Sequence, residues 1–327
     1  MSVDRILDMN AVQVFLTVAE EGSMSAAARR LGVTQSAISQ SVRQMEQLLG
    51  VRLIDRARRP LQLTPFGVAL RDRGARVLME VANLKGQVLE AGSGVKPTLR
   101  LGLVDSFAGI CGAALTKDLF ERTAQLSVRS GLSPQLGAAL HKRELDMIVA
   151  SEPLEAYAGL ERFRLFTEQY LIIVPPGERH GTITLDGMKQ LGKRLPLVRY
   201  NGKSQVGIHI GTFLRRHGIT ASNHLELDNA TTVAGMVAAG IGWAMTTPMC
   251  LMQNEKAATR VTTLRLERSA PERALFVIAR QGEYDQFFKH VCRIASNIVQ
   301  TEYLASLRQI IPQLDMLVTP AEGGDVA

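Results

Sequence analysis

The sequence is poor in cysteine, and its few thiols are not arranged for metal binding. Cys111, Cys250 and Cys292 lie far apart in a chain of 327 residues, and none belongs to a CxxC pair. Such sparse usage is typical of a reducing compartment and predicts no structural metal site. Buried free thiols are the simplest interpretation of all three.

Long apolar runs are also missing. The nearest candidate, Val233 to Met245, is rich in Ala and Gly and falls short of the roughly 18 apolar residues that a membrane span needs. The N-terminus has no basic segment followed by an apolar core, so no secretory signal is expected. We therefore expect a cytoplasmic protein that does not contact a membrane.

The common enzyme motifs are absent. Gly202-Lys203-Ser204 imitates the end of a phosphate-binding loop, but that motif needs a glycine where this chain has Leu197. The six histidines form no HExxH motif, and no GxSxG elbow occurs. An enzyme would need a Ser or Cys, a His and a carboxylate that converge in the fold, and we expect no catalytic residues.

The charge balance is basic. Lys and Arg number 38 against 31 Asp and Glu, which gives a formal net charge of +7. A positive chain suits an anionic partner such as nucleic acid, although many basic proteins bind none. The length is sufficient for two or three domains.

Residues 23–49 predict two helices joined by a tight turn. Ser23 is placed as the N-cap of a short helix that Gly32 ends, because a left-handed residue after the last turn favours glycine. Thr34 then caps a second helix, which Gly50 ends.

The second of these helices has two different faces. Its apolar stripe is formed by Ile38, Val42, Met45 and Leu49. The opposite face is small, uncharged or cationic: Gln35, Ser36, Ser39, Gln40 and Arg43. Such side chains can hydrogen-bond base edges in the major groove of DNA. The alternative is the solvated face of an ordinary pair of helices.

A basic hairpin is predicted next. Two short strands at 51–54 and 61–63 flank a tip that carries Arg56, Arg58 and Arg59. A wing of this kind would neutralise phosphates without reading bases. The alternative is a solvated charged hairpin.

A long helix follows, from Thr64-Pro65 to about Ala91. Thr is a good N-cap, and Pro is tolerated in the first turn. Its apolar positions are Leu70, Val77, Val81, Leu84 and Val88. Because this seam has nothing in its own domain to cover it, we predict a dimerisation helix.

After a Gly/Ser/Pro linker at 91–98, strands alternate with helices, which predicts an α/β domain. The expected strands are 99–104, 126–129, 145–150, 168–174, 195–200, 224–227, 242–246 and 273–280. The expected helices are 107–123, 134–142, 208–217, 230–239 and 284–300, with a further helix at 304–316 and a disordered tail at 319–327.

Four loops stand where ligands bind in open α/β sheets, after a strand and before a helix. Their hydroxyls are Ser106, Ser133, Ser204 and Thr231. Simple helix capping would explain the same residues. Lys203 lies in one of these loops and would favour an anionic ligand.

The N-terminal part of the chain resembles the DNA-binding domain of LysR-type transcriptional regulators. The resemblance rests on Phe15, Ala19, EEGS at 20–23, AAARRLGVTQSAISQSVRQMEQLLGVRLIDR at 26–56 and LTP at 63–65. It implies a winged helix-turn-helix at 1–65, a linker and dimerisation helix at 66–91 and a hinge at 92–98. It also implies a two-lobed periplasmic-binding-protein-like (type 2) effector domain, with lobe I at 99–167 and 273–303, lobe II at 168–272, and a C-terminal helix and tail at 304–327.

The resemblance further implies a role in transcription regulation. The implied partners are double-stranded promoter DNA with dyad symmetry, a small and anionic effector, further copies of the chain in a homodimer or homotetramer, and RNA polymerase as a candidate contact; no cofactor is implied. The expected DNA contacts are Ser23, Ser25, Thr34, Gln35, Ser36, Ser39, Gln40, Arg43, Arg52, Arg58, Arg59 and Thr64. Many members carry Arg where this chain has Gln40, so the half-site is left open.

The effector is expected in the cleft between the lobes. The expected contacts are Asp105, Ser106, Phe107, Ser133, Asn201, Lys203, Ser204, Asn229, Thr231 and Thr246. An alternative sensor mechanism is oxidation of cysteine, which for a Cys111–Cys250 disulfide would need the two Cα atoms within about 6 Å of each other.

Overall fold

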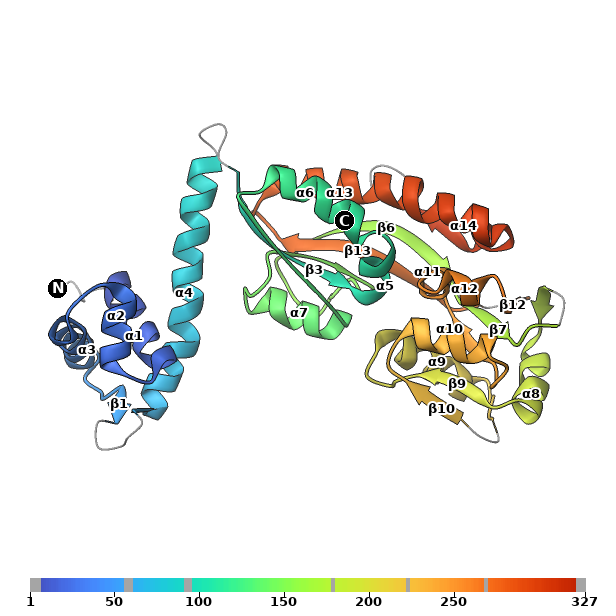
Figure 1. Ribbon diagram of the computed structural model, residues 1–327, viewed down its shortest axis with the longest axis horizontal. Helices are drawn as coiled ribbons and strands as arrows, with labels where there is room; N and C mark the ends of the chain where they lie inside the picture. The colour runs from blue at the N-terminus through green and yellow to red at the C-terminus, as the bar shows by residue number, and fades with distance from the viewer. Residues whose placement is uncertain are drawn as a thin grey trace. The chain divides into compact units, whose positions relative to one another are not determined.

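The computed structural model describes residues 7–55, 61–90, 96–177, 180–221, 224–267 and 270–321 (Figure 1). The chain divides into two compact units, Met1–Val95 and Lys96–Ala327, and each is described by itself. The predicted wing tip, with Arg56, Arg58 and Arg59, lies outside the described residues. No helix in the described part of the chain is long and apolar enough to cross a membrane.

The first unit begins with three short helices: α1 (Met9–Glu21), α2 (Met24–Leu31) and α3 (Gln35–Leu49). The side chains of Ser23 and Thr34 accept hydrogen bonds from Ala26 N and Ala37 N, and therefore cap α2 and α3. Gly32 has φ 68° at the end of α2, a left-handed conformation that an L side chain rarely adopts.

The core of the first unit forms where α1, α2 and α3 meet. Phe15 of α1 and Val42 of α3 are fully buried, and Ile38 and Met45 are nearly so. The expected buried stripe of α3 is wrong at its last position, because Leu49 is 38% exposed.

The wing is shorter than predicted. Strand β1 (Ile54–Asp55) pairs antiparallel with β2 (Gln62–Leu63), and α4 (Pro65–Glu90) follows. The first turn of α4 lies so close to the wing that a Cβ at Gly67 would meet Leu53 O at 2.1 Å. Further along α4, Val77, Val81 and Leu84 are exposed.

The first sheet of the second unit has the order β14-β6-β13-β5-β3-β4. Its strands are β3 (Thr98–Val104), β4 (Gln125–Gly131), β5 (Met147–Ala150), β6 (Leu160–Gln169), β13 (Glu272–Arg280) and β14 (Val318–Pro320). Strands β3, β4 and β5 are mutually parallel, whereas β13 runs antiparallel to both β5 and β6.

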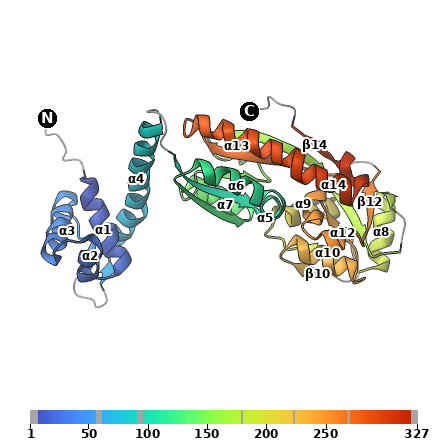
Figure 2. The ribbon, with the colours of Figure 1, turned by 45° about the horizontal axis from the view of Figure 1, so that its top comes forward.

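Helices cover both faces of this sheet. Figures 1 and 2 show α13 (Asp285–Ile298) and α6 (Gly112–Arg122) along one face and α7 (Ser133–His141) on the other. Strands β3 and β5 are buried along most of their length, as expected for parallel strands that helices cover on both faces.

The chain then enters a second sheet, with the order β11-β7-β12-β8. Its strands are β7 (Leu171–Val174), β8 (Gly181–Ile183), β11 (Ala244–Thr246) and β12 (Thr262–Leu266). A parallel pair, β9 (Leu197–Tyr200) and β10 (His224–Leu227), joins it through a bridge between Leu197 and Trp243. The helices here are α8 (Leu185–Arg194), α9 (Gln205–Arg216), α10 (Ala230–Ala238), α11 (Pro248–Met252) and α12 (Glu255–Ala258).

The structure corrects several expected elements. The single helix expected at 107–123 is two, α5 (Asp105–Ile110) and α6, separated at Cys111. The helix expected at 304–316 is a π-helical turn (Val299–Leu304), α14 (Ala305–Ile310) and a 3₁₀ helix (Pro312–Leu317). Thr319 and Pro320 lie in β14 rather than in a disordered tail, because their backbone pairs with β6. Strand β6 begins at Leu160, well before the strand expected at 168.

Candidate functional site

The exposed face of α3 is the first candidate site. Gln35, Ser36, Gln40 and Arg43 are exposed, and Ser39 is half-buried. The one carboxylate of this helix, Glu46, is turned aside, because its Oε1 accepts hydrogen bonds from Leu53 N at 2.9 Å and Ile54 N at 3.3 Å. The outward face of α3 therefore offers hydrogen-bonding and cationic groups, and its one carboxylate, which lines a shallow depression with Arg43 and Arg52, is held by the backbone of Leu53 and Ile54.

Three of the hydroxyls that were expected to contact DNA already have structural roles. Ser23 and Thr34 cap their helices, and Thr34 Oγ1 also lies 2.9 Å from Ser36 Oγ. Thr64 Oγ1 donates to Arg52 O at 2.6 Å and accepts from Gly67 N at 3.1 Å. Ser25 and Arg52 are exposed, and Arg52 lines the same shallow depression as Arg43.

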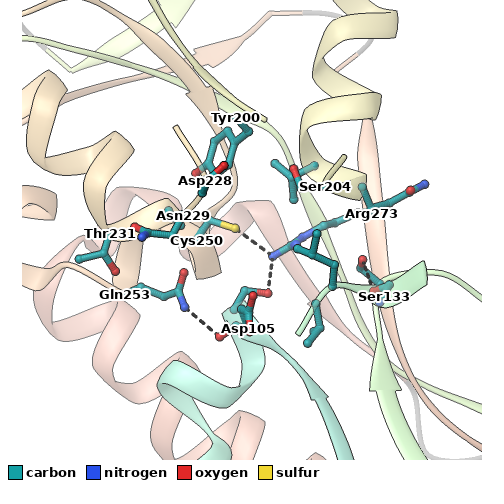
Figure 3. A pocket seen from close by; sticks show the side chains of 17 residues that line it. Asp105, Ser133, Tyr200, Ser204, Asp228, Asn229, Thr231, Cys250, Gln253 and Arg273 are labelled. Carbon is teal, nitrogen blue, oxygen red and sulfur yellow. Dashed lines mark hydrogen bonds between the residues drawn. The ribbon is translucent and has the colours of Figure 1, made fainter. Parts of the chain in front are cut away.

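The second candidate site is a cavity of about 130 Å³ between the two lobes of the second unit (Figure 3). The first lobe contributes the ends of β3 and β5 and the starts of α5, α7 and β13; the second contributes the ends of β9 and β10 and the starts of α9, α10 and α11. Six predicted effector residues line it: Asp105, Ser106, Ser133, Ser204, Asn229 and Thr231.

The other four predicted effector residues do not line this cavity. Phe107 is 0% exposed and packs in the core. Lys203 is exposed, and Asn201 bonds Asp228 Oδ1 through its side-chain nitrogen and Lys203 N through its side-chain oxygen. Thr246 is buried, with its hydroxyl 2.6 Å from Tyr200 Oη.

Several of the hydroxyls in the cavity have partners within the protein. Ser133 Oγ accepts from Ser151 N and lies 2.9 Å from Ser151 Oγ, which ties α7 to the end of β5. Ser204 Oγ caps α9 by accepting from Gly207 N and donates to Asn201 O. A Cβ at Gly207 would meet Asn201 O at 2.1 Å, so this glycine lets α9 lie against the preceding loop.

A buried ion pair forms the base of the cavity, and sequence reasoning missed it. Arg273 lines the cavity and pairs with Glu168, which lies at the end of β6. Arg273 Nη2 also donates to Ser106 Oγ at 3.3 Å and to Cys250 Sγ at 3.5 Å (Figure 3). The charged residues Glu272 and Arg273 at the start of a largely apolar strand were the available signal.

Burial changes the ionisation of groups around the cavity. It raises the pKa of Asp105, which a hydrogen bond from Ser130 only partly offsets. Burial opposes the charge of Arg273, but the neighbouring Cys250 sulfur and the Glu168 carboxylate favour the charged form, and the pKa of this guanidinium is raised. Arg273 therefore stays cationic.

The two candidate sites define a class of protein, in which a helix-turn-helix unit is joined to a two-lobed ligand-binding unit. Residues 9–68 match the family described as "Bacterial regulatory helix-turn-helix protein, lysR family", and residues 92–287 match "LysR substrate binding domain". The chain belongs to the LysR family and is a LysR-type transcriptional regulator. The predicted family, fold class and regulatory function are confirmed.

Individual relatives are distant. The chain is 33% identical over 168 residues to a probable hydrogen peroxide-inducible genes activator of Mycobacterium xenopi, covering 51% of this chain and 88% of that protein. It is 23% identical to the regulator EstR of Acinetobacter baylyi, and the match covers 89% of this chain and 98% of EstR.

Solved structures share the fold over nearly the whole chain. A full-length variant of OxyR from Pseudomonas aeruginosa aligns with a TM-score of 0.64 at 18% identity, covering 91% of this chain and 96% of that one. CbnR in complex with its target DNA aligns with a TM-score of 0.59 at 20% identity, covering 88% and 100%.

Proposed function

We propose that this regulator binds double-stranded promoter DNA as a homodimer or homotetramer and changes its DNA-bound arrangement when a small effector enters the cavity between the lobes. Helix α3 would enter the major groove, and the wing would lie along the phosphates. Two copies related by a two-fold axis would read a dyad-symmetric site. The proposal places the protein in the cytoplasm and assigns it no catalytic step.

The observation that carries the DNA-binding half is the composition of the outward face of α3. Gln40 and Arg43 are exposed, and the single acidic side chain of the helix is engaged by the wing backbone. The basic net charge of the chain supports the same proposal. CbnR, whose fold is shared, was solved with its target DNA.

The effector half rests on the position of the cavity. Both lobes contribute residues to it, so a molecule that touches both would favour one lobe arrangement over another. A ligand shifts an equilibrium only by its differential affinity for the two states. Binding in the cavity could thereby alter the spacing of the DNA-binding units in the oligomer.

Selection of bound sequences from random duplex DNA tests the proposed DNA binding. The full-length protein should enrich a motif with two-fold symmetry. Gln pairs with adenine and Arg with guanine, so Gln40→Arg should change the preferred base from adenine to guanine at one position in each half-site. An asymmetric motif, or an unchanged preference in Gln40→Arg, would contradict the docking of α3.

One observation favours a second mechanism, in which the cavity admits an oxidant. Cys250 lines the cavity, and its Sγ lies 3.5 Å from the Arg273 guanidinium. A peroxide could oxidise this thiol to a sulfenic acid with release of water. Two of the relatives, from Mycobacterium xenopi and Mycobacterium leprae, carry the name of probable hydrogen peroxide-inducible genes activators.

A further inference from the structure

The floor of the cavity offers hydrogen-bond donors to a ligand. The Arg273 side chain is only 2% exposed, and its Nε and Nη2 are engaged by Glu168, Ser106 and Cys250. Its other terminal nitrogen, Nη1, donates to no group in the described part of the chain. Because Arg273 lines the cavity, this buried cation has free N–H groups for an oxygen of the ligand.

The start of α7 adds one donor on the same lobe. This nine-residue helix begins at the cavity, where both Leu132 and Ser133 line the wall. Pro134 has no N–H, and Gln135 N and Leu136 N already donate to Leu132 O at 3.0 Å, so Ser133 N is the one donor of the first turn without an acceptor among the described residues. A ligand carboxylate would satisfy both the helix end and the guanidinium.

The cavity is nevertheless not surrounded by a net positive charge. Glu168 compensates the charge of Arg273 at 2.6 Å. Two further carboxylates, Asp105 and Asp228, line the cavity from different lobes, and neither forms an ion pair with a cation within the described ranges. Lys203, the cation expected from the sequence, is exposed and lies outside the lining.

This arrangement disfavours a ligand that carries only negative charge. Two carboxylates next to a bound anion would repel it, and because both are solvent-exposed, water would screen only part of that repulsion. A cationic group would remove that repulsion and would also compensate Asp105, which is exposed but loses enough hydration beside the cavity for its pKa to be raised. The same cavity therefore selects an anionic group beside Arg273 and a cationic group beside Asp105 and Asp228.

We infer that the effector is a zwitterion of amino-acid size, which binds with its carboxylate on Arg273 Nη1 and Ser133 N and with its ammonium group facing Asp105 and Asp228. The inference rests on the proposed effector role of the cavity. The volume of about 130 Å³ supports the size, because a protein cavity of about 150 Å³ accommodates benzene.

Matched sets of three small molecules test this inference on the full-length protein by isothermal titration and thermal shift. Each set has an amino acid, the same skeleton without the amine, and the same skeleton without the carboxylate. Suitable sets are leucine, 4-methylpentanoate and 3-methylbutylamine; phenylalanine, 3-phenylpropanoate and 2-phenylethylamine; and alanine, propanoate and ethylamine. The remaining common amino acids extend the search for the best side chain.

At least one amino acid should bind and raise the unfolding temperature, and its deamino partner should bind roughly ten- to a hundredfold more weakly, because a charge-assisted hydrogen bond is lost. Asp228→Asn and Asp105→Asn should each weaken binding of the amino acid and should reduce the difference in affinity between the amino acid and its deamino partner. Asp118→Asn on α6 is the matched control, because this carboxylate pairs with Arg122 away from the cavity and should change nothing.

Equal or tighter binding of the deamino acid, with no effect of Asp105→Asn or Asp228→Asn, would overturn the zwitterion but leave the cavity as the effector site. Binding that survives in both Asp variants and in Ser106→Ala would place the ligand elsewhere and overturn both proposals. The absence of binding by every amino acid would also overturn the inference.

Discussion

Arg273 and Glu168 form an ion pair inside the second unit, with Nη2 and Oε1 2.6 Å apart and the two side chains 2% and 0% exposed. Glu168 Oε2 also accepts hydrogen bonds from Met249 N at 2.9 Å and from Tyr303 Oη at 3.1 Å. The pair therefore connects β6 and β13, the two strands that pass between the lobes, with α11 and with the π-helical turn at Val299–Leu304.

Removing the anion of this pair should destabilise the second unit strongly. Glu168→Ala leaves a buried guanidinium and the Tyr303 hydroxyl without their acceptor, and breaking a buried pair in this way costs about 3–5 kcal/mol. Urea unfolding of the full-length protein measures the loss. The exposed pair of Asp118 and Arg122 is the control, and Asp118→Ala should cost less than about 1 kcal/mol. Similar losses of unfolding free energy in the two variants would show that the buried pair stabilises the protein no more than the exposed pair does.

The contrast between this pair and the helix-turn-helix shows what the sequence can predict. Ser23, Gly32, Thr34 and Gly50 determine helix ends through neighbours within a few residues, and the structure has those ends where they were expected. Glu168 and Arg273 are 105 positions apart, so no local pattern could pair them.

The cavity was predictable only in part, for the same reason. The loops with Ser106, Ser133, Ser204 and Thr231 could be found because each follows a strand and precedes a helix. Which side chains turn inward depends on long-range packing, so Phe107 and Lys203 were chosen although neither lines the cavity. The helix breaks at Cys111, between Gly109 and Gly112, and the prediction of one helix at 107–123 overlooked these two glycines as a sign of the break.

The apolar seam of α4 should be an interface between subunits. Val77, Val81 and Leu84 are 45%, 46% and 59% exposed in the single chain, which is unfavourable for side chains of this size unless a partner covers them. Leu84→Glu should therefore weaken self-association of the full-length protein, which size-exclusion chromatography with light scattering measures as a lower mass. Ala75→Glu is the control, since it lies nine residues earlier, on the opposite side of the helix at about 100° per residue. An unchanged mass for Leu84→Glu would place the interface elsewhere.

The three thiols should differ in reactivity. Burial, and then the charge of Glu302, raises the pKa of Cys111 to about 12, and burial, and then the charge of Glu161, raises the pKa of Cys292 to about 12. At pH 8 only roughly one in ten thousand of such thiols is ionised, and the thiolate is the reactive form.

Thiol labelling at pH 8 should therefore modify at most one cysteine per native chain, and mass spectrometry should locate it at Cys250, which lines the cavity. All three should react in urea, which controls for reagent and time. Labelling of Cys111 or Cys292 in the native protein would contradict their burial. A Cys250 that resists both the reagent and peroxide would exclude the oxidation mechanism.

Two arginines of the first unit should contribute differently to DNA affinity. Arg43 lies on the exposed face of α3, where a bidentate contact to a base is worth about 1–3 kcal/mol, whereas Arg52 precedes the wing, where a phosphate contact is expected. Arg43→Ala should weaken binding to the selected site more than binding to unrelated duplex. Arg52→Ala should weaken both equally and lower the slope of log affinity against log salt by about 0.9.

Fluorescence anisotropy over a salt series measures both quantities. Arg215→Ala removes the same charge from the exposed surface of α9 in the second unit and should leave site preference unchanged, so it separates local contacts from the loss of net charge. If Arg43→Ala reduced affinity for all sequences alike, Arg43 would contact phosphate rather than a base. Base reading would then fall to Gln35, Ser36, Ser39 and Gln40, because these are the remaining polar side chains of that face.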